Sequence, residues 1–263
     1  KIMKVKKRVL PPGWYPDTEQ KTRILLEEWE KEPRPDVNTG IAGVVPHAGW
    51  MFSGKLSFRV LRCLQKDVRT VVVVGGHLPK SGGILVSTED RYETPLGEIS
   101  ADKELLSSLM DQIEMKEDVF ADNTVEVQLP MIKYLFPDSL VLGLRAEPTE
   151  RAVTLGTMIG NIAQDEKKEI IVIGSTDLTH YGSAYGFAPK GVGEDAVRWV
   201  KEVNDKRVID ALLRFDYSAA IKHGNQDKAA CSIGGAVAAA AFAETAGKAV
   251  AEHIGYYTSR DIQ

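Results

Sequence analysis

The stretch TVVVV, residues 70–74, decides the fold, because its β-branched side chains do not alternate with polar ones. A run of this kind is typical of a strand that is buried on both faces, at the centre of a sheet. Two further apolar runs, IAGVV (41–45) and EIIVIG (169–174), predict other buried strands. The sequence therefore predicts a sheet that helices cover on both sides.

Outward from these strands, helical and extended patterns alternate along the chain. Helices are expected at 17–31, 53–66, 102–112, 123–136, 149–164, 194–214 and 232–245, and further strands at 83–87, 139–145 and 252–257. Pro130 should kink or restart the helix that contains it. We expect an α/β fold with a central mixed, mostly parallel sheet flanked by helices on both faces, forming one domain over residues 1–263.

Composition and charge argue against several classes of protein. Hydrophobic residues make up 43% of the chain and charged residues 27%, which favours a folded globular protein over a disordered one. The formal net charge of -4 and the lack of a long Lys/Arg block argue against nucleic acid as a partner. The apolar runs fall far short of the roughly 20 residues that cross a bilayer, and no signal peptide is recognisable. The two distant cysteines build no disulfide framework, so we expect a cytoplasmic protein without a membrane partner.

Three of the five histidines stand just past predicted strands. His47, His77 and His180 follow the strands expected at 41–45, 70–74 and 169–174, respectively. In open α/β sheets, ligands bind beyond the carboxyl ends of the strands, so these side chains can converge there. A single histidine after a strand is more often a hydrogen-bonded loop residue than a ligand, but three in equivalent places predict a shared site.

The loops around these histidines are rich in residues that permit close approach. PHAGW (46–50) places the imidazole of His47 between a rigid proline and Gly49, a residue beside which backbone or ligand can come near. GGHLPKSGG (75–83) holds His77 in a Gly- and Pro-rich loop. STDLTHYG (175–182) contains Asp177 and His180 and opens a long irregular stretch, which is typical of a functional loop.

The ligand that this set of side chains favours is a metal ion. Imidazole is the commonest protein ligand for metals, and two imidazoles with one anionic group leave positions open for substrate and oxygen. Cys231, at the start of a helix that would favour its thiolate, is one candidate for the anionic ligand, and Asp177 and Glu126 are carboxylate candidates. Each of the three could also be without a role in metal binding. Cys231 could be a small buried hydrophobe, Asp177 a turn cap and Glu126 a solvated helix residue. The other cysteine and histidines, Cys63, His223 and His253, are expected in structural positions.

Five motifs, taken in order along most of the chain, resemble those of the Memo family, which includes the proteins called AmmeMemoRadiSam system protein B. The motifs are RVLPPGWYPDTEQ (8–20), VVPHAGWMFSG (44–54), YETPLGE (92–98), NTVEVQLP (123–130) and GSTDLTHYG (174–182). The resemblance implies a fold similar to that of the LigB-type class III extradiol dioxygenases. Five ordered motifs make this resemblance much more specific than a single His-Ala-Gly would.

The resemblance also implies roles for individual residues. His47 and His77 correspond to metal ligands, Cys231 in ACSIGG to a third ligand, and His180 to a histidine that serves as acid or base. Non-haem iron or copper is the expected cofactor. Two departures stand out, because the family usually has a His-His pair where GGHLP offers one histidine, and Asn123 or Thr124 occupies the place of a motif histidine. These departures predict a weakened or empty metal site.

Two functions compete on these observations. The first is a metal-dependent dioxygenase or other oxidoreductase acting on an unknown small molecule, with His180 and Asp177 as catalytic residues and Gly49, Asn123 and Glu126 in the substrate pocket. The second is a protein that binds a small molecule or a peptide in the same cleft without turnover. Hydrolysis by a serine nucleophile is a weaker alternative, because no GxSxG motif is present. The substrate and the oligomeric state stay open.

Overall fold

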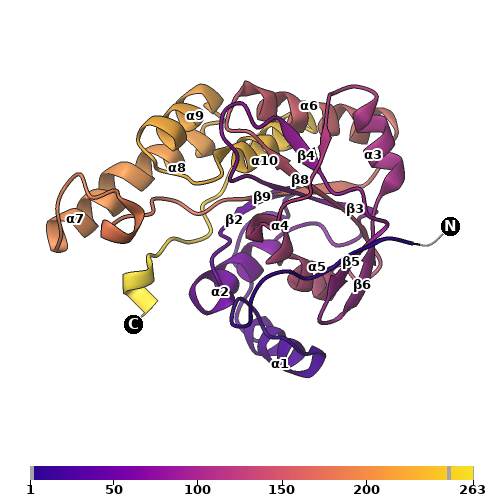
Figure 1. Ribbon diagram of the computed structural model, residues 1–263, viewed down its shortest axis with the longest axis horizontal. Helices are drawn as coiled ribbons and strands as arrows, with labels where there is room; N and C mark the ends of the chain where they lie inside the picture. The colour runs from indigo at the N-terminus through magenta and orange to yellow at the C-terminus, as the bar shows by residue number, and fades with distance from the viewer. Residues whose placement is uncertain (1–2, 248–249, 263) are drawn as a thin grey trace.

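A computed structural model describes residues 3–247 and 250–262 of the chain (Figure 1). Its main feature is a six-stranded sheet with the order β2-β9-β3-β8-β4-β7. The strands are β2 (Ala42–Val45), β3 (Thr70–Gly75), β4 (Ile84–Val86), β7 (Lys116–Glu117), β8 (Leu140–Ala146) and β9 (Ile170–Ser175). All neighbours are parallel except β4 and β8, which are antiparallel. The predicted mixed, mostly parallel sheet is confirmed, and the TVVVV stretch lies in a wholly buried inner strand.

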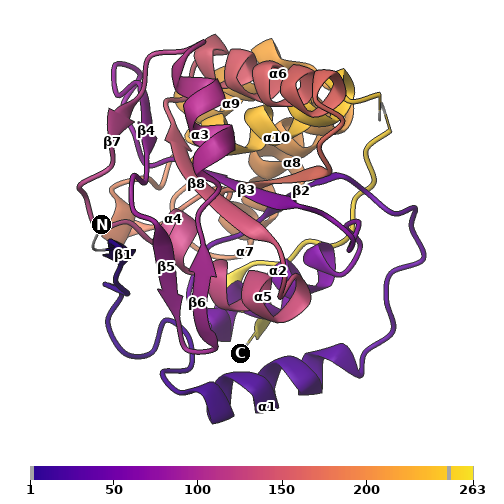
Figure 2. The same ribbon diagram turned by 90° about the vertical axis from the view of Figure 1, so that its right-hand side faces the viewer.

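Helices cover both faces of this sheet (Figure 2). One face carries α3 (Lys103–Met110), α6 (Glu150–Asp165), α8 (Asp205–Leu213), α9 (Tyr217–Gln226) and α10 (Ile233–Thr245). The other carries α1 (Glu19–Glu30), α2 (Trp50–Leu61) and α5 (Leu129–Leu135). Each layer has its own cluster of buried apolar side chains, so the sheet separates two hydrophobic cores. No helix in the described part of the chain is both long and apolar enough to cross a membrane.

A second, smaller sheet was not expected from the sequence. It consists of β1 (Val5–Lys6), β5 (Arg91–Thr94) and β6 (Gly97–Ser100). The hairpin between β5 and β6 turns at the TPLG sequence, where Gly97 has a φ of 104° that favours glycine. The buried Tyr92 of β5 accepts a hydrogen bond at its hydroxyl from the backbone N–H of Gly143, at 2.9 Å. The small sheet therefore packs on the second core next to α5.

Several boundaries differ from those expected. The helix predicted at 123–136 is two helices, α4 (Asn123–Glu126) and α5, with Pro130 in the first turn of the second, as its missing N–H requires. The helix predicted at 194–214 is α7 (Glu194–Trp199), a π-helical turn at Val200–Asn204, and α8. The strand predicted at 252–257 is wrong, because this segment has no strand pairing and follows the body of the protein as an extended chain. Short 3-10 turns lie at Ser183–Tyr185 and Ser259–Ile262.

Helix α10 lies unusually close to the sheet because small residues face it. A Cβ added to Gly235 would come within 2.2 Å of the carbonyl oxygen of Val74, so only glycine fits at that distance. The same helix is buried almost all round, which explains why its sequence is rich in alanine and shows no polar face. This close packing brings Cys231, two residues before the helix, to the carboxyl end of the central strands.

Candidate metal centre

Three side chains from distant parts of the chain converge at the carboxyl ends of the central strands. His47 follows β2, His77 follows β3 and Cys231 precedes α10. One potential ligand atom from each side chain lies within 4.8 Å of the other two, and the Sγ atom of Cys231 is 3.2 Å from Nε2 of His47. The convergence follows from the topology, since β2 and β3 pair in parallel with β9 on its two sides and their loops leave the sheet at the same edge.

His47 is buried, and three hydrogen-bond contacts hold its backbone and its imidazole in place. Its backbone N–H donates to Oδ1 of Asp177 at 2.7 Å, and its carbonyl oxygen accepts a hydrogen bond from Nδ2 of Asn123 at 2.9 Å. Its Nδ1 atom lies 3.1 Å from the hydroxyl oxygen of Ser175, at the end of β9. With Nδ1 so engaged, Nε2 is the atom that faces Cys231.

His77 takes an unusual backbone conformation. Its φ of 57° lies in the left-handed region. A residue other than glycine adopts this conformation only when its surroundings hold it there. The backbone N–H donates to Oγ of Ser232 at 3.1 Å, and Nδ1 lies 2.9 Å from Oδ2 of Asp122. The strained backbone therefore turns the ring toward Cys231, and Asp122 holds it in that position.

Asp122 connects His77 to the interior of the protein. Burial would raise the pKa of Asp122, but hydrogen bonds from His77 and Thr124 outweigh burial and lower that pKa to about 2. An ionised carboxylate only accepts hydrogen bonds, so Nδ1 of His77 is the donor and Nε2 remains for a ligand. The buried guanidinium of Arg145 lies 3.4 Å from Asp122 and forms two hydrogen bonds of 2.8 Å with Asp118. Asp122 is therefore oriented from both sides.

The electrostatics of the cluster favour an anionic sulfur. Burial would raise the pKa of the Cys231 thiol, but hydrogen bonds with His47 and His77 lower that pKa to about 5. The hydrogen bonds of His77 with Asp122 and with Cys231 raise the pKa of its imidazole to about 10. The position of Cys231 ahead of α10 also favours the thiolate, since the positive end of the helix dipole lies there. The thiolate is therefore paired with imidazole protons, which a metal ion bound to Sγ and the Nε2 atoms would replace.

Asp177 and His180 lie on one side of this cluster. The backbone carbonyl of Asp177 accepts a hydrogen bond from the N–H of Cys231 at 3.1 Å, and its Oδ2 is 3.9 Å from Nε2 of His47. Nε2 of His180 lies 3.6 Å from the same oxygen, and this contact with Asp177 raises the pKa of the His180 imidazole. The His180 side chain is 40% exposed, so it can exchange a proton with a molecule that arrives from solvent.

The donor set fits a first-row transition metal. Thiolate and imidazole are ligands that copper, zinc and iron accept, whereas magnesium and calcium prefer oxygen donors. Both imidazoles are oriented from behind through Nδ1, by Ser175 and by Asp122, as histidine ligands of metals commonly are. The chain thus offers a three-donor site with two imidazole nitrogens and one sulfur.

Three residues expected in the substrate pocket have other contacts. The carboxylate of Glu126 accepts hydrogen bonds from the N–H groups of Val9 and Leu10 and from the Tyr15 hydroxyl, so it anchors the N-terminal arm. Gly49 precedes α2, and a Cβ there would meet the backbone of Trp14 of the same arm at 3.6 Å. Asn123 holds the backbone of His47, as described above. These contacts give the three residues structural roles, and their part in a substrate pocket stays a prediction.

The remaining cysteine and histidines lie outside the cluster. Cys63 is buried in the core, as predicted. Nδ1 of His223 lies 2.7 Å from Oδ2 of Asp227 near the end of α9. His253 lies on the extended C-terminal segment, where no strand forms.

Sequence reasoning missed the residues that orient the ligands. Ser175, Ser232, Asp122 and Arg145 are ordinary residue types in ordinary patterns, and their function depends on which side chains lie behind them. Ser175 and Ser232 lie inside the GSTDLTHYG and ACSIGG motifs and Asp122 directly precedes NTVEVQLP, so these three carried a usable signal, whereas Arg145 carried none.

Comparison with known proteins agrees with these observations. A protein-family model described as "Memo-like protein" matches residues 12–263. A MEMO1 family protein of Pyrococcus furiosus is 30% identical over 98% of this chain and 94% of its own length. A MEMO1 family protein of Thermococcus onnurineus is 33% identical over 84% of this chain and 81% of its own. A solved structure, of the uncharacterized protein JW3007 from Escherichia coli K12, covers 84% of this chain with 12% identity and a TM-score of 0.42, which is too low for a conclusion.

Proposed function

The chain belongs to the family of Memo-like proteins, and we propose on this basis that it is a metal-dependent oxidoreductase acting on a small molecule. The observation that carries the proposal is the convergence of His47, His77 and Cys231 within 4.8 Å. We further propose that residues 1–263 form one domain, which the shared sheet between the two cores supports.

We propose iron or copper as the metal. Both accept imidazole and thiolate ligands, and either would supply electron transfer and a binding position for oxygen or substrate. Zinc would bind the same donors without redox chemistry, so the identity of the metal separates oxidoreductase from other functions. The single histidine of the GGHLP loop reaches the cluster, which supports a usable site despite the missing second histidine of the family.

The protein's own residues would bind the substrate and move a proton. Asp177 holds His180 at 3.6 Å and stabilises the protonated imidazole, so His180 is the proposed acid or base. Asp177 also accepts hydrogen bonds from the backbone N–H groups of both His47 and Cys231. Its second role is therefore to hold the two loops that carry these ligands next to each other. The exposed side of His180 is where the substrate would meet this pair.

Elemental analysis of protein purified without chelator tests the metal site. We expect about one iron or copper ion per chain in the wild type and a loss of bound metal in His47→Ala and Cys231→Ala. Cys63→Ala is the matched control, because it removes a buried thiol of the core without touching the cluster. Equal metal content in Cys231→Ala and Cys63→Ala would refute the site.

Oxygen uptake with a panel of catechols tests turnover. His180→Gln should retain the metal and lose about 10²–10⁴-fold in rate if the imidazole transfers a proton. A wild-type protein that holds the metal, binds a ligand and consumes no oxygen would instead support the second function, binding in the same cleft without turnover. A zinc-loaded protein would likewise exclude the oxidoreductase.

A further inference from the structure

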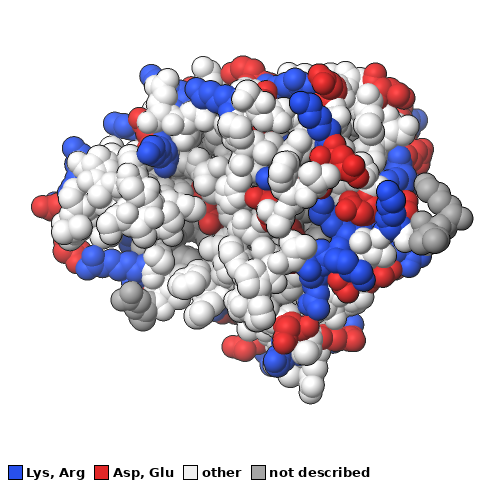
Figure 3. Space-filling model, in the orientation of Figure 1, with Lys and Arg blue, Asp and Glu red and all other residues white. Residues whose placement is uncertain are grey.

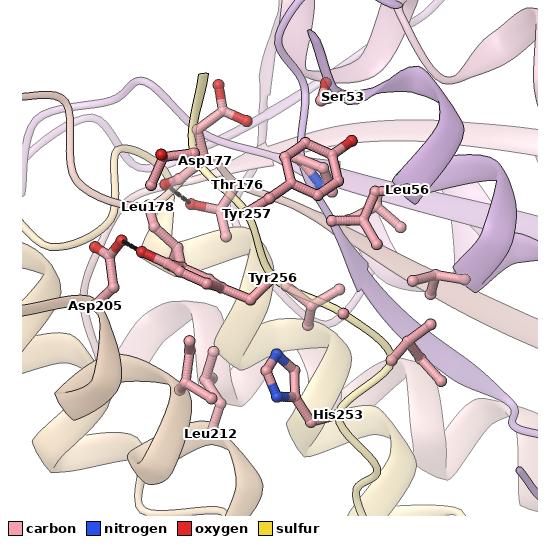
Figure 4. A pocket seen from close by; sticks show the side chains of 18 of the residues that line it. Ser53, Leu56, Thr176, Asp177, Leu178, Asp205, Leu212, His253, Tyr256 and Tyr257 are labelled. Atoms are coloured by element: carbon pink, nitrogen blue, oxygen red, sulfur yellow. Dashed lines mark hydrogen bonds between the residues drawn. The ribbon is translucent and has the colours of Figure 1, made fainter. Parts of the chain in front are cut away.

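A large cavity lies beside the metal centre. Its volume is about 900 Å³, and we call it the chamber. Its walls are α2, α8, α10, the outer edge of β2 and the extended C-terminal segment 250–258. Figure 4 shows Leu56 and Tyr257 on one side of the C-terminal segment, and Leu212 and His253 on the other. A volume of this size is within the range of sites that enclose small organic molecules.

The chamber and the metal centre share a wall. Thr176 and Asp177 line the chamber, and the Thr176 hydroxyl oxygen lies 4.0 Å from Sγ of Cys231. Pro46 and Ala48, the two neighbours of His47, also line it. His180 lines the same end, next to Asp177. A molecule in the chamber would therefore have one end beside the acid–base pair.

The walls away from this end are mostly apolar, although Asn38, Glu252 and His253 also line the chamber. The apolar part includes Leu56 of α2, Leu212 of α8 and the alanine face of α10. The surface over this part of the molecule is mostly uncharged, while Lys and Arg gather toward its edges (Figure 3). The body of a ligand would therefore meet hydrocarbon, whose burial favours binding by about 25 cal/mol per Å².

The charged side chains that line the chamber already have hydrogen-bond or ion-pair partners. Among the described lining residues, Arg260 is the one Lys or Arg, and it pairs with Glu194. The Asp205 carboxylate accepts hydrogen bonds from the Tyr256 hydroxyl at 2.7 Å and from the N–H of Thr179 at 3.0 Å. Glu252 accepts a hydrogen bond from the N–H of Asn38, and the imidazole of His180 already faces the Asp177 carboxylate at 3.6 Å. An anion would meet that carboxylate as well as apolar walls, so the chamber disfavours an anionic ligand.

Asp205 also connects the chamber to the catalytic loop. Tyr256 belongs to the C-terminal segment that closes the chamber, and Thr179 directly precedes His180. Figure 4 shows the contact between Tyr256 and Asp205. The further contact of Asp205 with Thr179 ties the C-terminal segment to the loop that holds the acid–base pair. The wall and the polar end are thus one connected structure.

We propose that the chamber is the binding site for the substrate, an uncharged, elongated, apolar molecule with one polar end that reaches Asp177 and His180. The proposal rests on the function proposed above, since it names the substrate class of the same site. The chamber receives the apolar body, and the metal centre lies beyond the polar end. A fatty alcohol has this chemistry, whereas the matching fatty acid carries a charge.

Fluorescence of the neutral dye Nile red, with 1-decanol and decanoate as competitors, tests the proposal on the full chain. We expect one saturable site per chain, and displacement by 1-decanol at least about tenfold more effective than by decanoate above pH 7. Leu56→Trp should weaken dye binding at least about tenfold by filling the chamber. Met51→Trp is the matched control on the same helix, since Met51 is 74% exposed and does not line the chamber.

Ala240→Leu provides a second filling variant on α10, in case Leu56→Trp fails to fold as judged by circular dichroism. No saturable dye binding, equal losses in the filling and control variants, or displacement by decanoate as effective as by 1-decanol would each overturn the proposal. Metal content is measured on the same samples. Metal-loaded protein without a dye site refutes the chamber alone, whereas a dye site in protein that binds no metal refutes the proposed function and leaves the chamber as a binding site.

Discussion

Replacing Asp122 by asparagine changes one hydrogen-bond partner of His77 and leaves the size of the side chain unchanged. In the wild type, Oδ2 of Asp122 accepts from Nδ1 of His77 at 2.9 Å, while Oδ1 accepts from the N–H of Thr124 at 2.8 Å. The asparagine oxygen would keep the bond to Thr124, so the amide NH₂ would face His77. Two donors would then meet, and His77 would have to move its proton to Nε2 to relieve the conflict.

The size of the expected loss in metal affinity depends on the protonation of Nε2 of His77. A metal needs the lone pair of Nε2, so binding to the variant must first return the proton to Nδ1 against an opposing donor. Loss of such an orienting carboxylate typically costs 10–100-fold in metal affinity, which is about 1.4–2.7 kcal/mol. We expect this weakening in Asp122→Asn, with stoichiometry still near one because His47, Cys231 and a rotated His77 remain.

Titration with Co²⁺, followed by the absorbance of its bond to the thiolate, measures the affinity. Asp118→Asn is the matched control, because Asp118 also binds Arg145 but has no contact with His77 in the described structure. We expect the control to bind Co²⁺ as the wild type does. An affinity of Asp122→Asn within about threefold of wild type, or an equal loss in both variants, would refute the reasoning.

Three further predictions concern the fold and the residues around the site. Gly235→Ala should destabilise the protein by about 3 kcal/mol or more in urea unfolding, because its Cβ would lie 2.2 Å from a backbone oxygen, whereas Gly49→Ala should cost less than about 1 kcal/mol. Glu126→Ala should cost about 1–3 kcal/mol and speed proteolysis of the N-terminal arm without changing metal affinity; a fall in metal affinity would instead favour Glu126 as a carboxylate ligand. Burial raises the pKa of Asp205, so the folded state binds more protons than the unfolded state between the unfolded pKa near 4 and the higher folded pKa. Wild-type stability should therefore fall relative to Asp205→Asn as the pH rises through this window, and a pH-independent difference in urea unfolding would contradict the raised pKa.

Much of the fold was predictable because its signals are local. Uninterrupted apolar runs identify buried strands, and β2, β3, β8 and β9 lie within a residue or two of the ranges expected for them. The segment 252–257 shows the limit of such signals, since its composition suits a strand but no partner pairs with it. Strand formation depends on a neighbouring edge, which composition does not report.

The candidate site was likewise predictable only in part. The places of His47, His77 and His180 after predicted strands, and the motifs around them, already indicated a shared site at the carboxyl end of the sheet. The orientation of each donor atom was not accessible, because it depends on Ser175 behind one imidazole and Asp122 behind the other. These contacts join residues more than 40 positions apart, and no local pattern relates them.

The sequence by itself determined the buried strands of the main sheet, most of the helices, the family, and the loops that carry the candidate ligands, because hydrophobic periodicity and contiguous motifs are properties of neighbouring residues. Tertiary structure alone decided that Glu126 anchors the N-terminal arm, that Asp122 orients His77, and that a chamber adjoins Asp177. A side chain's role is set by the groups it meets in space. Packing brings those groups together from distant parts of the chain.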